Sequence, residues 1–270
     1  MSDLEDSPGR DNGLYVASVE KAFKVLTVFS DSSAELGLTD VAARCGLGKS
    51  ATQRFLHTLH VLGYLNQNPA NKMFSLSAKL LALSRAYLAS DVLRQRAEGI
   101  LAQANDLCEE TINLTILDDV SVVYILRFPS KHIVSVNLSV GTRLPAFCTA
   151  PGRVLLAAKA PDERDEALRR SDLKSYTDKT EVSPMRLRNL LATVREQGFA
   201  LSDQETFLGD ISVAAPVFDE SGNVLAAINI AVPSPRWNVE RVQEELAPFV
   251  VETAHKVSVA MGWRGGQTAR

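Results

Sequence analysis

Cysteine is scarce in this 270-residue chain, and Cys45, Cys108 and Cys148 lie far apart. Three isolated cysteines exclude a disulfide framework and a cysteine-based zinc cluster. No apolar run approaches the roughly 20 residues that a membrane-spanning helix needs. The chain starts MSDLEDSPGRDNG, which is acidic and polar and therefore unlike a secretory signal peptide. We expect a cytoplasmic protein with no membrane association, in which residues 1–13 form a disordered tail.

The chain also has no excess of positive charge. Lys and Arg number 29 against 32 for Asp and Glu, which gives a net charge of −3. This balance excludes a protein coated in basic charge for non-specific binding of polyanions. Hydrophobic residues make up 46% of the chain, enough for buried cores, and the length fits two domains.

Acidic residues are absent from one long segment. Residues 41–90 contain no Asp or Glu, and their basic residues are Arg44, Lys49, Arg54, Lys72, Lys79 and Arg85. This gap has two interpretations. It is either a chance feature of a mostly buried helical region or a local basic surface that meets phosphate groups.

The same segment has the pattern of a helix-turn-helix. Residues 15–29 predict a first helix, with Val19, Ala22, Phe23, Leu26 and Phe29 on one apolar face. Thr39 is expected to cap a short helix over 40–45. Gly46-Leu47-Gly48 then forms the turn before a helix over 49–62, and Phe55, Leu56, Leu59 and Leu62 form the inner face of that helix.

Polar side chains mark the outer face of this third helix. Arg pairs well with guanine and Gln with adenine, whereas Lys and short hydroxyls suit phosphates. Any solvated surface helix is polar too, so the gap in acidic residues and the following hairpin are needed to favour DNA binding. Residues 64–76 predict that hairpin, with its turn over 66–72, as a wing. The expected DNA-binding residues are Lys49, Ser50, Thr52, Gln53, Arg54, His57 and Lys72.

The segments after the wing predict a linker helix and an α+β domain. Residues 77–91 form the linker helix, whose apolar residues exceed what one face needs and indicate packing against a partner. Residues 92–263 form the second domain, which opens with a helix over 92–110. Consecutive strand signals with helices on one side predict an antiparallel sheet. The strands are expected over 112–117, 120–128, 133–138, 198–202, 211–218 and 224–232.

Catalytic patterns are weak in the second domain. His132 and His255 lack the spacing of a metal site, Cys148 has no base pattern nearby, and Ser212 lies outside any G-x-S-x-G motif. The apolar strands do carry sparse polar residues, among them Ser202, Asp210, Ser212 and Asn229. Gly152 is expected to open a helix whose N-terminus favours a carboxylate. These features indicate a small-molecule pocket or, equally, polar residues at strand edges.

Several blocks along residues 14–262 resemble the IclR-type transcriptional regulators: VASVEKAFKVL, LTDVAARCGLGKSATQRFLHTLHVLGYL, VGTRLPAFCTAPGRVLLA and GFALSDQETFLGDISVAAPVFDESGNVLAAINIAVPSPRW. The GTRLPAFCTAPGRVLLA block is particularly similar to regulators of the β-ketoadipate pathway, which sense aromatic acids or their catabolites. The resemblance implies a winged helix-turn-helix at residues 14–76, a linker helix, and a GAF-like effector domain at residues 92–263. It further implies dimers that pair into tetramers, and palindromic operators.

The resemblance also assigns an effector pocket and places the DNA-reading helix at residues 49–57. The implied effector-binding residues are Ile133, Val136, Leu144, Ala150, Pro151, Ser202, Asp210, Ser212, Asn229 and Ala231. The chain departs from its relatives at residues 209–212, where they usually have Gly-Leu-Arg-Ser and this chain has Gly-Asp-Ile-Ser. If Asp210 faces the ligand, a dianionic effector is repelled, and a phenolic hydroxyl, amide or hydrazide-like donor is accepted better.

These observations predict a ligand-responsive transcription factor that has no catalytic activity and needs no metal or cofactor. Two alternatives remain open. One is an enzyme acting on small aromatic acids with a fused DNA-binding domain, and the other is an architectural DNA-binding protein without an effector. Turnover of a bound ligand distinguishes the first alternative, and a lack of any effector response distinguishes the second.

Overall fold

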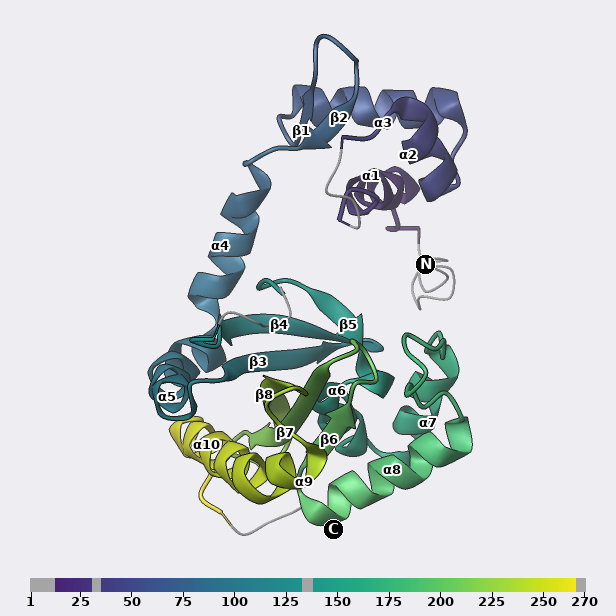
Figure 1. Cartoon of the computed structure of the whole chain (residues 1–270). Coiled ribbons are helices and arrows are strands. Elements are labelled where there is room, and N and C mark those ends of the chain that lie inside the picture. The colour runs from purple at the N-terminus through teal and green to yellow at the C-terminus, as the bar shows by residue number, and fades with distance from the viewer. Residues whose placement is uncertain (1–12, 31–34, 133–137, 266–270) are drawn as a thin grey trace. The chain divides into compact units, whose positions relative to one another are not determined.

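The computed structural model divides into two compact units, residues 1–90 and 91–270 (Figure 1). It describes residues 13–30, 35–132 and 138–265. The division between the units falls after Ser90, next to the end of the expected linker helix. Among the helices of these described ranges, none is long and apolar enough to cross a membrane.

Three helices form the body of the N-terminal unit: α1 (Ala17–Thr27), α2 (Leu38–Cys45) and α3 (Lys49–Val61). Gly46 ends α2 with a φ of 64°, a left-handed conformation that glycine adopts at little cost. The expected cap at Thr39 is wrong, because α2 begins earlier and has Gly37 as its N-cap. The Asp40 carboxylate accepts a hydrogen bond from the Gly37 amide at 3.2 Å, which fixes this earlier start.

The apolar face of α1 is divided between the core and the surface. Val25, Val28 and Phe29 are buried with α2 and α3, whereas Val19 and Phe23 are 51% and 61% exposed. The expected single packing face over residues 19–29 is therefore wrong in its first half. The segment packs through Val25 of α1 and through Val28 and Phe29, which follow the helix, and these three share one core with residues of α2 and α3.

A two-stranded antiparallel hairpin, β1 (Leu65–Gln67) and β2 (Phe74–Leu76), follows α3 as the predicted wing. Glu35 holds the loop of this wing, because its carboxylate accepts hydrogen bonds from the side-chain amides of Asn68 at 3.3 Å and Asn71 at 2.9 Å. The linker helix α4 (Leu80–Ser90) begins three residues later than expected and has no buried residue.

The C-terminal unit is built on one antiparallel sheet. Within the described residues its strand order is β5-β4-β3-β8-β7-β6. The order is not sequential, because β8 returns to pair with β3. The predicted strand over residues 133–138 lies almost wholly outside the described residues. The strands are β3 (Thr111–Asp118), β4 (Ser121–Phe128), β5 (Arg143–Pro145), β6 (Ala200–Asp203), β7 (Asp210–Phe218) and β8 (Val224–Pro233).

Helices cover both faces of this sheet, so the expectation of helices on one side is wrong. On one face, α5 (Val92–Cys108) and α10 (Ala247–Ala260) pack on β3, β7 and β8. On the other face, α6 (Ala150–Ala157) and α8 (Pro184–Gln197) form a second core. The sheet is therefore the middle layer of three (Figure 1). The remaining elements are a 3₁₀ turn at Ala146–Cys148, α7 (Pro161–Arg170), α9 (Val239–Arg241) and a π-helical turn at Val242–Leu246.

Candidate functional site: a polar pocket and a recognition helix

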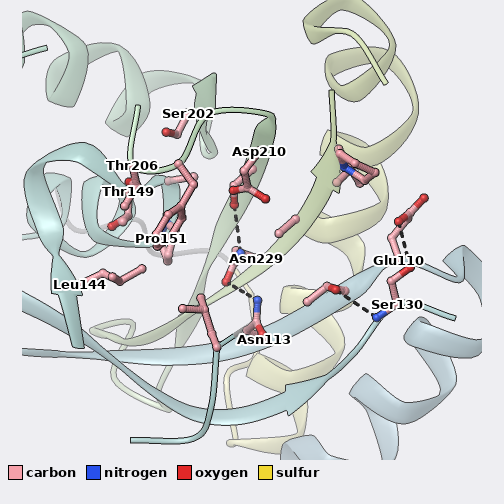
Figure 2. Close-up of a pocket in the computed structure, with 18 of the residues that line it drawn as sticks. Glu110, Asn113, Ser130, Leu144, Thr149, Pro151, Ser202, Thr206, Asp210 and Asn229 are labelled. Atoms are coloured by element: carbon pink, nitrogen blue, oxygen red, sulfur yellow. Dashed lines mark hydrogen bonds between the residues drawn. The ribbon is translucent and has the colours of Figure 1, made fainter. Parts of the chain in front are cut away.

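Strand alternation directs polar side chains to the α6 face of the sheet. Ile211 and Val213 of β7 lie in the core under α10, so Asp210 and Ser212 point to the opposite face. Asn113 and Asn229 pair across β3 and β8 on that same face. A cavity of about 260 Å³ lies there (Figure 2). This volume is close to the lower end of the range for small-molecule sites, roughly 300 Å³.

The structure brings most of the sequence-predicted effector residues to this pocket. Eight of the ten line it, whereas Ile133 and Val136 lie outside the described residues. These eight residues come from the β5 edge, from α6 and from three neighbouring strands. They are Leu144, Ala150, Pro151, Ser202, Asp210, Ser212, Asn229 and Ala231.

A row of hydrogen-bonded side chains crosses the floor of the pocket. Arg127 Nη1 donates to Asn113 Oδ1 at 3.0 Å, and Asn113 Nδ2 donates to Asn229 Oδ1 at 3.3 Å. Asn229 Nδ2 in turn donates to the Ser212 hydroxyl oxygen at 3.0 Å. Because a guanidinium only donates, its position at one end fixes the orientation of both amides. The row therefore ends on a hydroxyl that accepts from Asn229.

The wall beside α6 is built around Thr149. Gly152 was expected to open the helix, but α6 starts at Ala150 with Thr149 as its N-cap. The Thr149 side chain accepts from the Gly152 amide, and its carbonyl accepts from the Arg153 amide. Pro151 has no amide hydrogen. The start of α6 therefore offers a carboxylate fewer donors than the sequence suggested.

A buried ion pair supports this wall from behind. Arg153 on α6 and Glu205, which follows β6, are 3% and 8% exposed. Their two hydrogen bonds measure 2.5 and 2.6 Å, in a bidentate arrangement. Glu205 also accepts from the Glu181 amide at 3.0 Å. The pair fixes the loop after β6, which brings Thr206 to the pocket.

The pocket contains the carboxylate of Asp210, whose pKa is raised. Burial raises its pKa from 3.8 to about 6, and the positive charge of Arg127 opposes that rise. Burial also raises the pKa of the Tyr124 hydroxyl, which lines the same pocket, and the charge of Asp210 adds to this effect. Tyr124 therefore stays neutral, and Asp210 is ionised above about pH 6.

The raised pKa of Asp210 predicts a pH-dependent stability. The folded protein holds the Asp210 proton more tightly than the unfolded chain, so the free energy of unfolding falls as pH rises from about 4 through about 6. The change amounts to at most roughly 3 kcal/mol. Urea unfolding followed by tryptophan fluorescence measures it, since Trp237 and Trp263 both lie in the C-terminal unit. Asp210→Asn should be nearly equal to wild type at about pH 4 and more stable above pH 6; a constant difference contradicts the assignment.

Cys148, which precedes the pocket residue Thr149, is unsuited to nucleophilic chemistry. Cys148 is fully buried, and burial raises its pKa to about 11. The thiol is therefore protonated at neutral pH, and a thiol is a poor nucleophile. In the described ranges, no group of three or more His, Cys, Asp or Glu residues is arranged to hold a metal ion.

Helix α3 presents most of the residues that are expected to meet DNA. Lys49, Ser50, Gln53, Arg54 and His57 are exposed on it, and Lys72 is exposed on the wing. Thr52 is the exception, and its assignment to the outer face is wrong. It is completely buried, and its hydroxyl donates to the Gly48 carbonyl at 3.1 Å. Thr52 precedes Leu56 by four residues and Leu59 by seven, so helical periodicity puts it on the inner face.

Several residues that line the pocket are not predicted from the sequence. The alternation in Thr111-Ile112-Asn113-Leu114-Thr115 was a usable signal, because its polar residues share one face of β3. Glu110 and Arg127 had no such signal. Glu110 is 2% exposed and accepts from Arg236 at 2.6 Å and from the Trp237 indole at 2.9 Å. The missed lining residues also include Tyr124, Ser130, Leu138, Thr149, Thr206, Phe207 and Pro233.

A winged helix-turn-helix followed by a sheet domain with a small polar pocket defines a class, the transcriptional regulators that carry their own effector domain. The family model "Bacterial transcriptional regulator IclR C-terminal" matches residues 85–259. The model "IclR helix-turn-helix domain" matches residues 18–69. The chain belongs to the IclR family of bacterial transcriptional regulators, which are DNA-binding proteins and not enzymes.

Relatives of known name cover nearly all of the chain. It is 34% identical to the Pca regulon regulatory protein of Pseudomonas putida over 88% of this chain and 81% of that protein. It is also 34% identical to the transcriptional regulator KdgR of Escherichia coli, over 97% of both chains. A crystal structure of a regulator from Rhodococcus sp. RHA1 has 34% identity and a TM-score of 0.76, and the match covers 92% of this chain and 98% of that one.

Proposed function

We propose that this regulator binds a small aromatic acid or a related aromatic catabolite in the pocket on the α6 face, and that the ligand alters its binding to operator DNA or its activation of a promoter. The observation that carries the proposal is the convergence of the eight predicted residues on one pocket. The apolar walls from Leu144, Pro151 and Ala231 suit a ring, and the polar row of the floor suits its substituents. The GTRLPAFCTAPGRVLLA block, which resembles regulators of aromatic catabolism, supports this effector class.

The N-terminal unit is proposed to read a palindromic operator as part of a dimer, or of a dimer of dimers. In this arrangement α3 enters the major groove, and Gln53 and Arg54 face the base edges. Lys49, Ser50, His57 and the wing residue Lys72 contact the backbone. The exposed apolar residues Leu81, Leu83 and Tyr87 of α4 are suited to packing against a second copy. Because bacterial operators lie in the cytoplasm, the protein acts there.

Variants of α3 test the DNA interface. Arg54→Ala is expected to weaken operator binding by about 1–3 kcal/mol and to relax the preference for one base pair. Lys72→Ala should weaken all DNA similarly and reduce the slope of log K against log salt by about 1. Fluorescence anisotropy with labelled DNA from upstream of the protein's own gene measures both effects. Arg195→Ala on α8 is the control for loss of an exposed arginine, and equal effects of Arg195→Ala and Arg54→Ala overturn the assignment.

A further inference from the structure

Three hydroxyl groups on the α6 side of the pocket already donate their protons to backbone carbonyls. Thr149 Oγ1 donates to the Pro145 carbonyl at 3.1 Å. Ser202 Oγ and Thr206 Oγ1 both donate to the Cys148 carbonyl, at 3.1 and 3.0 Å. A hydroxyl has a single proton, so each of these groups offers a ligand only its lone pairs.

Asp210 adds a further acceptor to the same cavity. It lines the pocket, and within the described residues no hydrogen bond to its carboxylate oxygens is formed. In Figure 2, Asp210, Ser202, Thr206 and Thr149 lie on the same side of the Asn229–Asn113 pair. An ionised carboxylate only accepts hydrogen bonds, so Asp210 and the three hydroxyl oxygens give this side of the cavity four acceptor groups.

The floor supplies a donor. Ser212 Oγ accepts from Asn229, at the end of the row that starts on Arg127. Asn229 does not accept the Ser212 proton, because the guanidinium fixes the orientation of both amides. No other group among the described residues accepts it either, so this proton is available to a ligand. A ligand therefore meets one hydroxyl donor, from Ser212, beside the acceptors Asp210 on the same strand and Ser202 on the neighbouring strand β6.

We propose, on the basis of the aromatic effector described above, that the pocket selects a neutral aromatic amide that bears a ring hydroxyl, in preference to the corresponding carboxylate. The amide N–H and phenolic O–H groups supply the donors that Asp210 and the three hydroxyl oxygens lack. The amide carbonyl accepts the proton of Ser212. A carboxylate group brings only acceptors. It also places a second negative charge in the same small cavity as Asp210, where the positive charge of Arg127 only partly offsets the effect of burial.

Calorimetric titration of the full-length protein at about pH 7.5 tests the inference with three para-substituted rings: 4-hydroxybenzamide, 4-hydroxybenzoate and terephthalate. Wild type should bind the amide at least about tenfold more tightly than the monoanion, and terephthalate should bind weakest. Asp210→Leu should lower the ratio of amide to carboxylate affinity by about tenfold, which corresponds to roughly 1.4 kcal/mol. Asp210→Asn should lower it less, because its side-chain oxygen still accepts.

Asp172→Leu is the matched control, because it removes a carboxylate that is 84% exposed and outside the pocket. Its affinity ratio should equal that of wild type. If wild type prefers a carboxylate, or if Asp210→Leu leaves the ratio unchanged, the inference is overturned and the aromatic effector stands. If none of the three compounds binds to wild type, the aromatic effector and the inference fail together.

Discussion

Replacing Gly152 by alanine is expected to destabilise the C-terminal unit by about 3 kcal/mol or more, the upper range for an overpacked core. A Cβ at Gly152 overlaps the backbone carbonyl and Cα of Ala146, which cannot rotate away as a side chain can. Relief of this overlap moves α6 away from the 3₁₀ turn before it, and that movement distorts the pocket wall at Thr149 and Pro151. Urea unfolding followed by tryptophan fluorescence measures the loss of stability.

Gly99→Ala is the control for this substitution. Gly99 lies on the exposed side of α5, and an added Cβ there meets no atom within 4 Å. Alanine is favoured over glycine inside a helix, so Gly99→Ala should stabilise the unit by about 0.5–1 kcal/mol. Equal stabilities of the two variants contradict the close packing assigned to Gly152.

Arg153→Met is expected to destabilise the same unit by about 3–5 kcal/mol, because it leaves the buried carboxylate of Glu205 without its counterion. The double variant Arg153→Met/Glu205→Leu should recover part of this loss, since it removes the uncompensated charge. The recovery is incomplete, because the Glu181 amide then lacks its acceptor. Unfolding of the two variants under identical conditions measures the difference.

The exposed pair Glu252–Lys256 on α10 is the matched control for the buried pair. Its side chains are 65% and 56% exposed, so Glu252→Gln should change the stability by no more than about 0.5 kcal/mol. If Arg153→Met is as mild as Glu252→Gln, the ion pair does not support the pocket wall in the way described. The same result argues against its role in placing Thr206.

Local patterns predicted the elements of the fold well. Glycines at 46 and 48, helical periodicity in α3 and turn residues in the wing act over a few neighbours, so the sequence reveals them directly. The β7–β8 hairpin follows equally from the turn at 219–222. The spacing of Thr52 to Leu56 and Leu59 places it on the inner face, although its polar character favours the outer one. Thr39 has the side chain of a cap, but Asp40 lies three residues after Gly37 and closes the turn there.

The arrangement of the pocket residues depends on pairing between strands that are distant in the sequence, and local sequence patterns do not reveal this pairing. Asn113 and Asn229 are 116 residues apart and become neighbours only because β8 inserts beside β3. The strand pattern and the family resemblance both indicated Asn229, but neither indicated its partner Asn113 or Arg127, which donates to Asn113. The same holds for Glu110, because its partner Arg236 is 126 residues away along the chain. The orientation of the hydroxyl protons, on which ligand choice depends, follows only from the folded structure.

The most direct test of ligand control is the coupling between the two binding events. Operator affinity is measured by anisotropy with and without a saturating amount of the tightest-binding aromatic compound, and ligand affinity is measured with and without the operator. The proposed function predicts that the ligand changes operator affinity by roughly 5–150-fold, and that the operator changes ligand affinity by the same factor. Binding of both partners to one protein with no mutual effect would contradict it.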